Sequence, residues 1–195
     1  MNTPYHLQEY ANKARETAIY PEACRFTYPA LGLAGEWGEV MDELHPGPGL
    51  TAPRWKWMRE LGDLLWYVVN AAFDVDLNLH DLAAAVTGGL RSDTFEALCF
   101  QRLARHDRRD PFLKITVAIG QVAEVAKKAI RDGYAEQLPL GKKSIVASAL
   151  VAILAGICEL CDKYDLSLDE IAAINNQKLL DRKERGKIQG DGSER

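Results

Sequence analysis

The stretch LGLAGEWGEVMDEL, residues 31–44, carries the clearest helical pattern in the chain. Its apolar residues recur at helical spacing, which predicts a helix packed against a core; they are Leu33, Trp37, Val40, Met41 and Leu44. Two glutamates, Glu36 and Glu39, lie on the flank of the same face. A carboxylate beside an apolar interior is costly unless a positive group meets it. We therefore expect cations next to this helix.

The length and charge of the chain limit the classes of protein to consider. A chain of 195 residues is enough for one substantial domain or two small units with a shared core. The net charge of −4 argues against a general nucleic-acid binder, because such proteins are normally distinctly basic. No apolar run approaches membrane-spanning length, and the N-terminus lacks the apolar core of a signal peptide. We expect a cytoplasmic protein that binds neither nucleic acid nor membranes.

Helical patterns dominate the rest of the sequence, and no segment alternates as a strand would. They predict an all-α protein with helices near 3–18, 29–45, 52–74, 79–87, 93–106, 111–132, 142–164 and 168–184. The sequence DVDLNLHDLAAAV (74–86) recurs in similar form as KYDLSLDEIAAIN (163–175). We infer two related halves, residues 1–90 and 91–195, which pack together as one pseudo-symmetric helical bundle with a shared core.

A second acidic pair, Glu60 and Asp63, lies three residues apart in an otherwise apolar helix. A short turn allows this helix to run antiparallel to the first, which would place the two acidic pairs opposite each other. Carboxylates held that close repel by about 3 kcal/mol per neighbouring pair at an intermediate dielectric. Cations between them relieve the repulsion, and a set of oxygen ligands suits Mg²⁺ or Mn²⁺ better than zinc.

The second half helps to decide whether the acids face the interior or the solvent. Either acidic pair alone is more often part of a solvated face. The matching helix of the second half, however, has Ala149, Ala152 and Gly156 where the first has Glu60, Asp63 and Tyr67. A solvated stripe is expected to stay polar in a duplicate. The apolar copy therefore favours positions that face inward in both halves, and with them the metal interpretation.

The C-terminal segment carries a row of basic residues. Asn175, Lys178, Arg182 and Arg185 share one helical face, and the segment after Gly186 is rich in glycine and ends at Arg195. Convergent Lys and Arg side chains can hold a polyphosphate. A solvated helix end is an equally good interpretation of the spacing, because cations there also favour the helix dipole.

Three segments together resemble the MazG-like all-α nucleoside triphosphate pyrophosphohydrolases, a group that includes dimeric dUTPases and dCTP pyrophosphatases. They are YPALGLAGEWGEV (28–40), RELGDLLWYV (59–68) and NNQKLLDRKERGKIQGDGSER (175–195). The family pattern of ExxE, a loop and ExxD falls on Glu36, Glu39, Glu60 and Asp63. The resemblance implies that these four acids are the catalytic, Mg²⁺-binding residues. It also implies cleavage of a (deoxy)nucleoside triphosphate to its monophosphate and pyrophosphate, as part of nucleotide-pool housekeeping.

The same resemblance assigns the substrate contacts. Lys178, Arg182 and Arg185 would hold the β- and γ-phosphates, with Asn175 on the same face and Lys187 and Arg195 as further candidates. Tyr67 and Asn70, one and two turns beyond Asp63, are expected to contact the sugar or the base. For Trp37 and Trp66, stacking on the base and packing in the core both remain open.

The chain departs from the family pattern in the distribution of these residues. The acids belong to the first half and the basic segment to the second, which is degenerate in acids. We therefore expect a fused pseudo-dimer with one competent site, which can also form further homodimers. The alternative is a catalytically inactive bundle that acts as a nucleotide sensor or a partner-binding scaffold. A di-iron bundle is disfavoured, because none of the four histidines completes a Glu-x-x-His motif.

Overall fold

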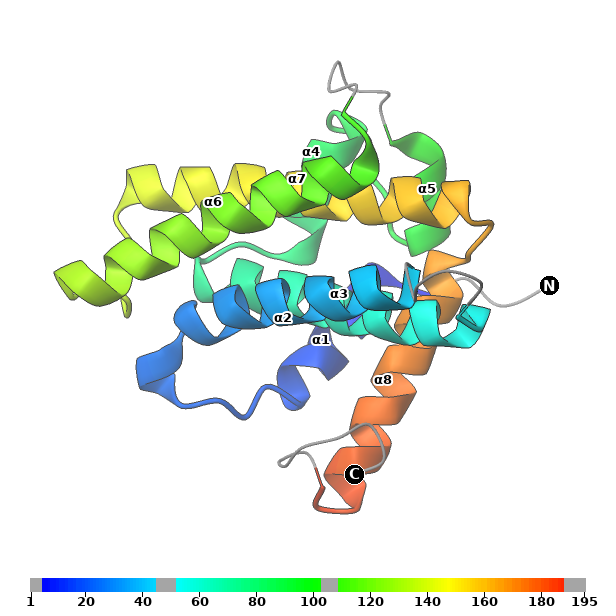
Figure 1. Cartoon of the computed structure of the whole chain (residues 1–195), viewed down its shortest axis with the longest axis horizontal. Coiled ribbons are helices and arrows are strands. Elements are labelled where there is room, and N and C mark those ends of the chain that lie inside the picture. The colour runs from blue at the N-terminus through cyan, green and yellow to red at the C-terminus, as the bar shows by residue number, and fades with distance from the viewer. Residues whose placement is uncertain (1–4, 45–51, 103–108, 188–195) are drawn as a thin grey trace.

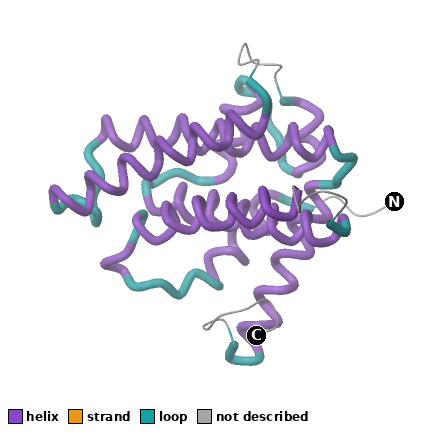
Figure 2. Tube along the Cα trace, in the orientation of Figure 1, coloured by secondary structure: helices purple, strands orange, loops and turns teal. Residues whose placement is uncertain are grey.

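The computed structural model describes residues 5–44, 52–102 and 109–187, and these form helices joined by loops (Figures 1 and 2). The elements are α1 (Leu7–Glu16), a 3₁₀ turn (Glu22–Cys24), α2 (Thr27–Leu44), α3 (Arg54–Asp74), α4 (Leu79–Thr87), α5 (Phe95–Gln101), α6 (Pro111–Asp132), α7 (Leu140–Lys163) and α8 (Leu168–Glu184). Within the described ranges there is no strand, only an isolated bridge between His6 and Thr94. The prediction of an all-α fold is confirmed.

The predicted helices are present, with differences at their ends. The first helix ends at Glu16 and the fifth ends at Gln101, before the extended backbone of Arg102. The two copies of the repeated motif adopt the same turn. Asp76 and Asp165 each have a positive φ, of 64° and 53°, two residues before the side chain that caps the following helix. Local sequence similarity therefore corresponds here to the same local structure.

The four long helices form two packed pairs, α2 with α3 and α6 with α7 (Figure 1). The pairs meet along α2–α6 and α3–α7. The shorter helices cross between the predicted halves, because α8 packs on α3 and α4 packs on α7. One continuous core results, with buried residues from every helix. This exchange agrees with the proposal of two related halves, whose duplication stays a prediction.

Helix α7 corrects one expectation. Leu140–Lys163 is long and apolar enough, by length and composition, to cross a membrane. Its most apolar window is 61% buried within the described part of the chain. The surrounding helices α3, α4, α5 and α6 account for this apolarity, because they cover α7 on several sides.

Candidate metal centre

Three of the four predicted acids meet between α2 and α3. Glu36, Glu60 and Asp63 each offer a carboxylate oxygen within 4.8 Å of those of the other two. The helices are antiparallel here, since Glu43 near the end of α2 accepts hydrogen bonds from Lys56 and Trp57 near the start of α3, both at 3.0 Å. Glu60 is 3% exposed, so the predicted inward orientation is confirmed for this acid.

Glu39 stands at the rim of this cluster. It lies one turn beyond Glu36 and is exposed, and it does not belong to the group of three carboxylates. Partial burial raises its pKa, and the charges of Glu60 and Asp63 raise it further. Glu39 is therefore within electrostatic reach of the cluster.

Two residues of α8 complete the site from the other end of the chain. Lys178 Nζ lies 2.5 Å from Asp63 Oδ1 and 2.6 Å from Oδ2. Asn175 Nδ2 donates to Asp63 Oδ1 at 2.7 Å. The acids of the first half and the polar face of the last helix thus meet directly, at Asp63.

The contact of α8 with Asp63 depends on a close crossing of α8 and α3. A Cβ at Gly62 would lie 2.9 Å from the Asn175 Cβ, so the glycine lets α8 approach the backbone of α3. Asn175 is 1% exposed, and its Oδ1 accepts from the Tyr10 hydroxyl at 3.0 Å. Helix α1 therefore fixes the amide of Asn175, which in turn orients the Asp63 carboxylate.

Arg59 pairs with Glu60, the second acid of the cluster. This contact was not predicted from the sequence. Its Nη2 and Nε lie 2.7 Å and 3.0 Å from Glu60 Oε1. Adjacent residues of a helix point about 100° apart, so the spacing gives no hint of this contact. It depends on the long arginine side chain folding back.

Glu36 has no cationic partner of this kind. Within the described residues it forms neither a hydrogen bond nor an ion pair. Burial raises the pKa of its carboxyl to about 8, and the negative charges of Asp63, Glu39 and Glu60 add to the effect. An oxygen-only donor set with one uncompensated acid is the chemistry that a hard divalent cation satisfies. The residues present therefore fit Mg²⁺ or Mn²⁺.

The pKa of Glu36 predicts how the metal-free protein responds to pH. Its pKa is raised from 4.5 to about 8, so the folded protein holds a proton that the unfolded chain releases. Stability should therefore fall as pH rises from about 4.5 to about 8, and Glu36→Gln should reduce that slope. Urea denaturation in a chelator across this range measures both. An unchanged slope in the variant would contradict the assignment.

An aromatic cluster borders the acids. The ring of Tyr67, a residue of α3, lies against α2 at Gly32, and its centroid is 6.1 Å from that of Tyr28. Tyr28 in turn stacks on Tyr20 at 4.9 Å. Burial, the neighbouring Tyr28 and the charges of Glu36 and Asp63 raise the pKa of Tyr67. Tyr67 is thus half-buried beside the acids, which is compatible with its predicted sugar or base contact.

Gly32 is required for this arrangement. A Cβ at this position would lie 2.0 Å from Tyr67 Cε1, so Gly32→Ala must displace the ring. We expect a loss of about 1–3 kcal/mol in the free energy of unfolding, measured in urea. Gly35→Ala on the same helix meets nothing within 4 Å and should be neutral or stabilising by up to about 1 kcal/mol. Equal effects of the two substitutions would contradict the packing described.

Asn70, a predicted site residue, and the two tryptophans lie in the core. Trp37 and Trp66 are 6% and 8% exposed, which supports core packing over base stacking. Asn70 is fully buried, accepts from Arg15 at 2.6 Å and donates to the Trp66 carbonyl at 2.9 Å. Because its amide is enclosed and engaged, it offers a substrate no atom. We leave Asn70 out of the proposed site.

The basic residues beyond Lys178 are also not gathered at the acids. Arg182 is 6% exposed, whereas a phosphate-binding group should be presented to an open cleft. Arg185 pairs with Asp181, its Nη2 lying 2.7 Å from Oδ2, at the exposed end of α8. Lys187 is exposed just beyond the helix. Arg195 lies outside the described residues, together with Gly190 and Gly192.

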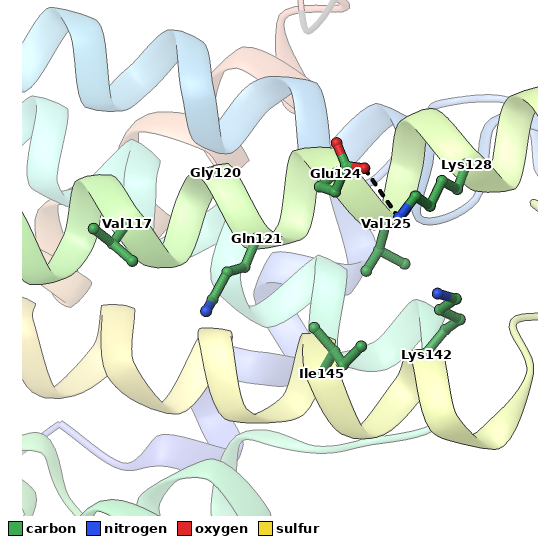
Figure 3. Close-up of a pocket in the computed structure, with 8 residues that line it drawn as sticks. All are labelled: Val117, Gly120, Gln121, Glu124, Val125, Lys128, Lys142 and Ile145. Atoms are coloured by element: carbon green, nitrogen blue, oxygen red, sulfur yellow. Dashed lines mark ion pairs between the residues drawn. The ribbon is translucent and has the colours of Figure 1, made fainter.

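The described residues around the cleft between α6 and α7 form no acidic cluster. A cleft of about 270 Å³ lies between α6 and α7, and Figure 3 shows Gln121, Glu124, Lys128 and Lys142 around it. In the predicted duplication, Gln121 corresponds to Glu36 and buried Ala149 to Glu60. Glu124 is already paired with Lys127 at 2.5 Å and with Lys128 at 3.1 Å. The described part of the second half thus lacks the donor set of the first.

Comparison with known proteins finds a phage relative. The chain is 34% identical over 84 residues to Gene 37 protein of Mycobacterium phage L5, across 37% of this chain and 74% of the phage protein. No family model and no solved structure matches the chain. The extent of the alignment shows that this chain belongs to the same family as the phage L5 Gene 37 protein.

Proposed function

We propose that the protein is a Mg²⁺-dependent, MazG-like nucleoside triphosphate pyrophosphohydrolase, which converts a (d)NTP to the (d)NMP and pyrophosphate. One observation carries the proposal. Asp63, beside Glu36 and Glu60, is held by Lys178 and Asn175 from a helix more than a hundred residues away in the chain. Clustered oxygen ligands next to a phosphate-binding cation are what phosphoanhydride hydrolysis needs.

The acids would hold the metal, and the α8 residues the phosphates. Glu36, Glu60 and Asp63 are the ligands, with Glu39 at the rim. Bound Mg²⁺, or Mn²⁺ in its place, supplies positive charge at the phosphoryl oxygens and lowers the pKa of a coordinated water. Lys178 offers its ammonium to the triphosphate, and Arg185 and Lys187, at and just beyond the C-terminal end of α8, are candidates for its distal end. Tyr67 borders the acids on the side where the nucleoside would lie.

The proposal predicts one active site per chain. The first half supplies the carboxylates and the last helix the cation, whereas the groove of the second half has Gln121 and Ala149 at the matching positions. Titration with a non-hydrolysable nucleotide analogue and Mg²⁺ should therefore give one equivalent bound per chain. Binding without turnover would favour the alternative of a nucleotide sensor. The activity suits cytoplasmic nucleotide-pool housekeeping.

A panel of canonical and modified nucleoside triphosphates with Mg²⁺ tests the reaction. The products should be the monophosphate and pyrophosphate, separated from orthophosphate by ³¹P NMR, and a chelator should stop the reaction. Predominant release of orthophosphate would reject the cleavage position. Absence of turnover across the whole panel would reject the enzyme.

A further inference from the structure

Lys178 is paired with Asp63, a carboxylate that a metal ion would need as a ligand. Its ammonium contacts both oxygens of Asp63, at 2.5 Å and 2.6 Å, and Asn175 donates to one of them at 2.7 Å. A carboxylate has about four acceptor positions, so at most one remains. A divalent cation at that position is repelled by the adjacent ammonium, because two positive charges would share one carboxylate.

Of the two α8 groups on Asp63, Lys178 is the one that can leave. Asn175 is 1% exposed and its amide oxygen is fixed by the Tyr10 hydroxyl. The side chain of Lys178 is 17% exposed, and its flexible four-carbon stem can swing the charge without moving the helix. Asn175 would therefore keep Asp63 oriented while Lys178 moves.

The balance of charges in the cluster favours replacement of the Lys178 ammonium by a divalent ion. Arg59 balances Glu60 and Lys178 balances Asp63, whereas Glu36 has no partner within the described residues. When Glu36 is ionised, the three carboxylates are thus short of one positive charge. Replacing the ammonium by a divalent ion supplies that charge and frees a cation beside the site.

We propose that Lys178 is the counter-ion of Asp63 when no metal is bound, and that its ammonium moves to the phosphates of the substrate once the metal binds. This inference rests on the proposed function, because it requires a metal at the acids. It makes Lys178 a positioning residue for the empty site and a substrate ligand for the filled one. Metal binding and phosphate binding are then coupled through one side chain, and each must favour the other.

The test is direct Mn²⁺ binding without nucleotide, measured by electron paramagnetic resonance. Lys178→Met removes the competing charge and should tighten Mn²⁺ binding about tenfold, within the range usual for coupled sites. Lys178→Arg keeps the charge and should stay close to the wild type. Lys183→Met is the matched control, since Lys183 lies on the same helix and pairs with the exposed Glu16 at 3.3 Å. It should leave Mn²⁺ affinity unchanged.

The outcomes separate this inference from the proposed function. If Lys178→Met binds Mn²⁺ no tighter than the wild type, or Lys183→Met tightens binding equally, the counter-ion role is overturned. If Asp63→Asn binds Mn²⁺ as tightly as the wild type, the metal lies elsewhere and the proposed function fails with it. Circular dichroism checks that each variant is folded. If Lys178→Met is not folded, Lys178→Gln takes its place in the Mn²⁺ measurement.

Discussion

Asp63→Asn should lower kcat for nucleoside triphosphate hydrolysis by at least about a thousandfold, because removal of a metal ligand costs several kcal/mol of transition-state stabilisation. The asparagine has the shape of the aspartate but not its charge. It keeps an acceptor for Asn175 and Lys178 while removing an anionic oxygen from the cluster. Steady-state kinetics with Mg²⁺, at a saturating concentration of whichever triphosphate is hydrolysed, measures the effect.

The control is the same substitution at an acid outside the cluster. Asp42 lies on α2 and is exposed, and it is not among the three clustered carboxylates. Asp42→Asn should keep kcat within about twofold, as expected for a surface charge remote from the chemistry. Unchanged turnover in Asp63→Asn, or an equal loss in both variants, would remove Asp63 from the proposed site.

Asp74→Ala should destabilise the protein by about 3–5 kcal/mol, because it removes a buried carboxylate that accepts two hydrogen bonds and faces two arginines. The Asp74 side chain is fully buried at the C-terminal end of α3. Its Oδ2 accepts from the Tyr20 hydroxyl and the Phe26 amide, both at 2.8 Å. Its Oδ1 lies 3.6 Å from Arg15 Nη1 and 3.8 Å from Arg25 Nε. Removal of the carboxylate leaves the Tyr20 hydroxyl and the Phe26 amide without this acceptor and removes the ion pairs with the two arginines.

The hydrogen bond between the Phe26 amide and Asp74 fixes the backbone at the start of α2. Phe26 has a positive φ of 59°, and its amide is tied to Asp74 immediately before the helix that carries Glu36. Urea denaturation measures the loss. Asp132→Ala is the control, because Asp132 is exposed and pairs only on the surface with Arg131, so we expect a change below about 1 kcal/mol. Equal losses would contradict the buried role of Asp74.

The sequence predicts the helices well because their apolar faces are local patterns. The stretch that begins at Leu31 lies within α2, and its residues Leu33, Trp37 and Val40 are buried as their spacing predicts. The comparison of Glu60 with Ala149 also predicts burial correctly, since both positions are at most 3% exposed. In each case the information lies within one helix or in the segment that it resembles.

Contacts between helices are harder to predict from the sequence. The meeting of Lys178 with Asp63 was expected in general form, but the structure selects Asn175 and Lys178 and leaves Arg182 buried. That selection depends on where α8 crosses α3 at Gly62, which no local pattern encodes.

The same limit explains the error at Asn70. The residue continues the polar stripe of Glu60 and Asp63, which suggested a place in the site. Helix α1 covers that part of α3, however, and Arg15 takes up the amide in a buried network. A polar stripe on one helix shows only that its residues need partners, and the neighbouring helices decide which partners they meet.

A double-mutant cycle between Asp63 and Lys178 tests the central claim most directly. The free energies of unfolding of the wild type, Asp63→Asn, Lys178→Met and the double variant are measured in a chelator. If the early acids and the last helix form one site, the two substitutions should be coupled by about 1 kcal/mol or more. Effects that add within about 0.5 kcal/mol would show that the two residues do not interact in solution, which would contradict the account.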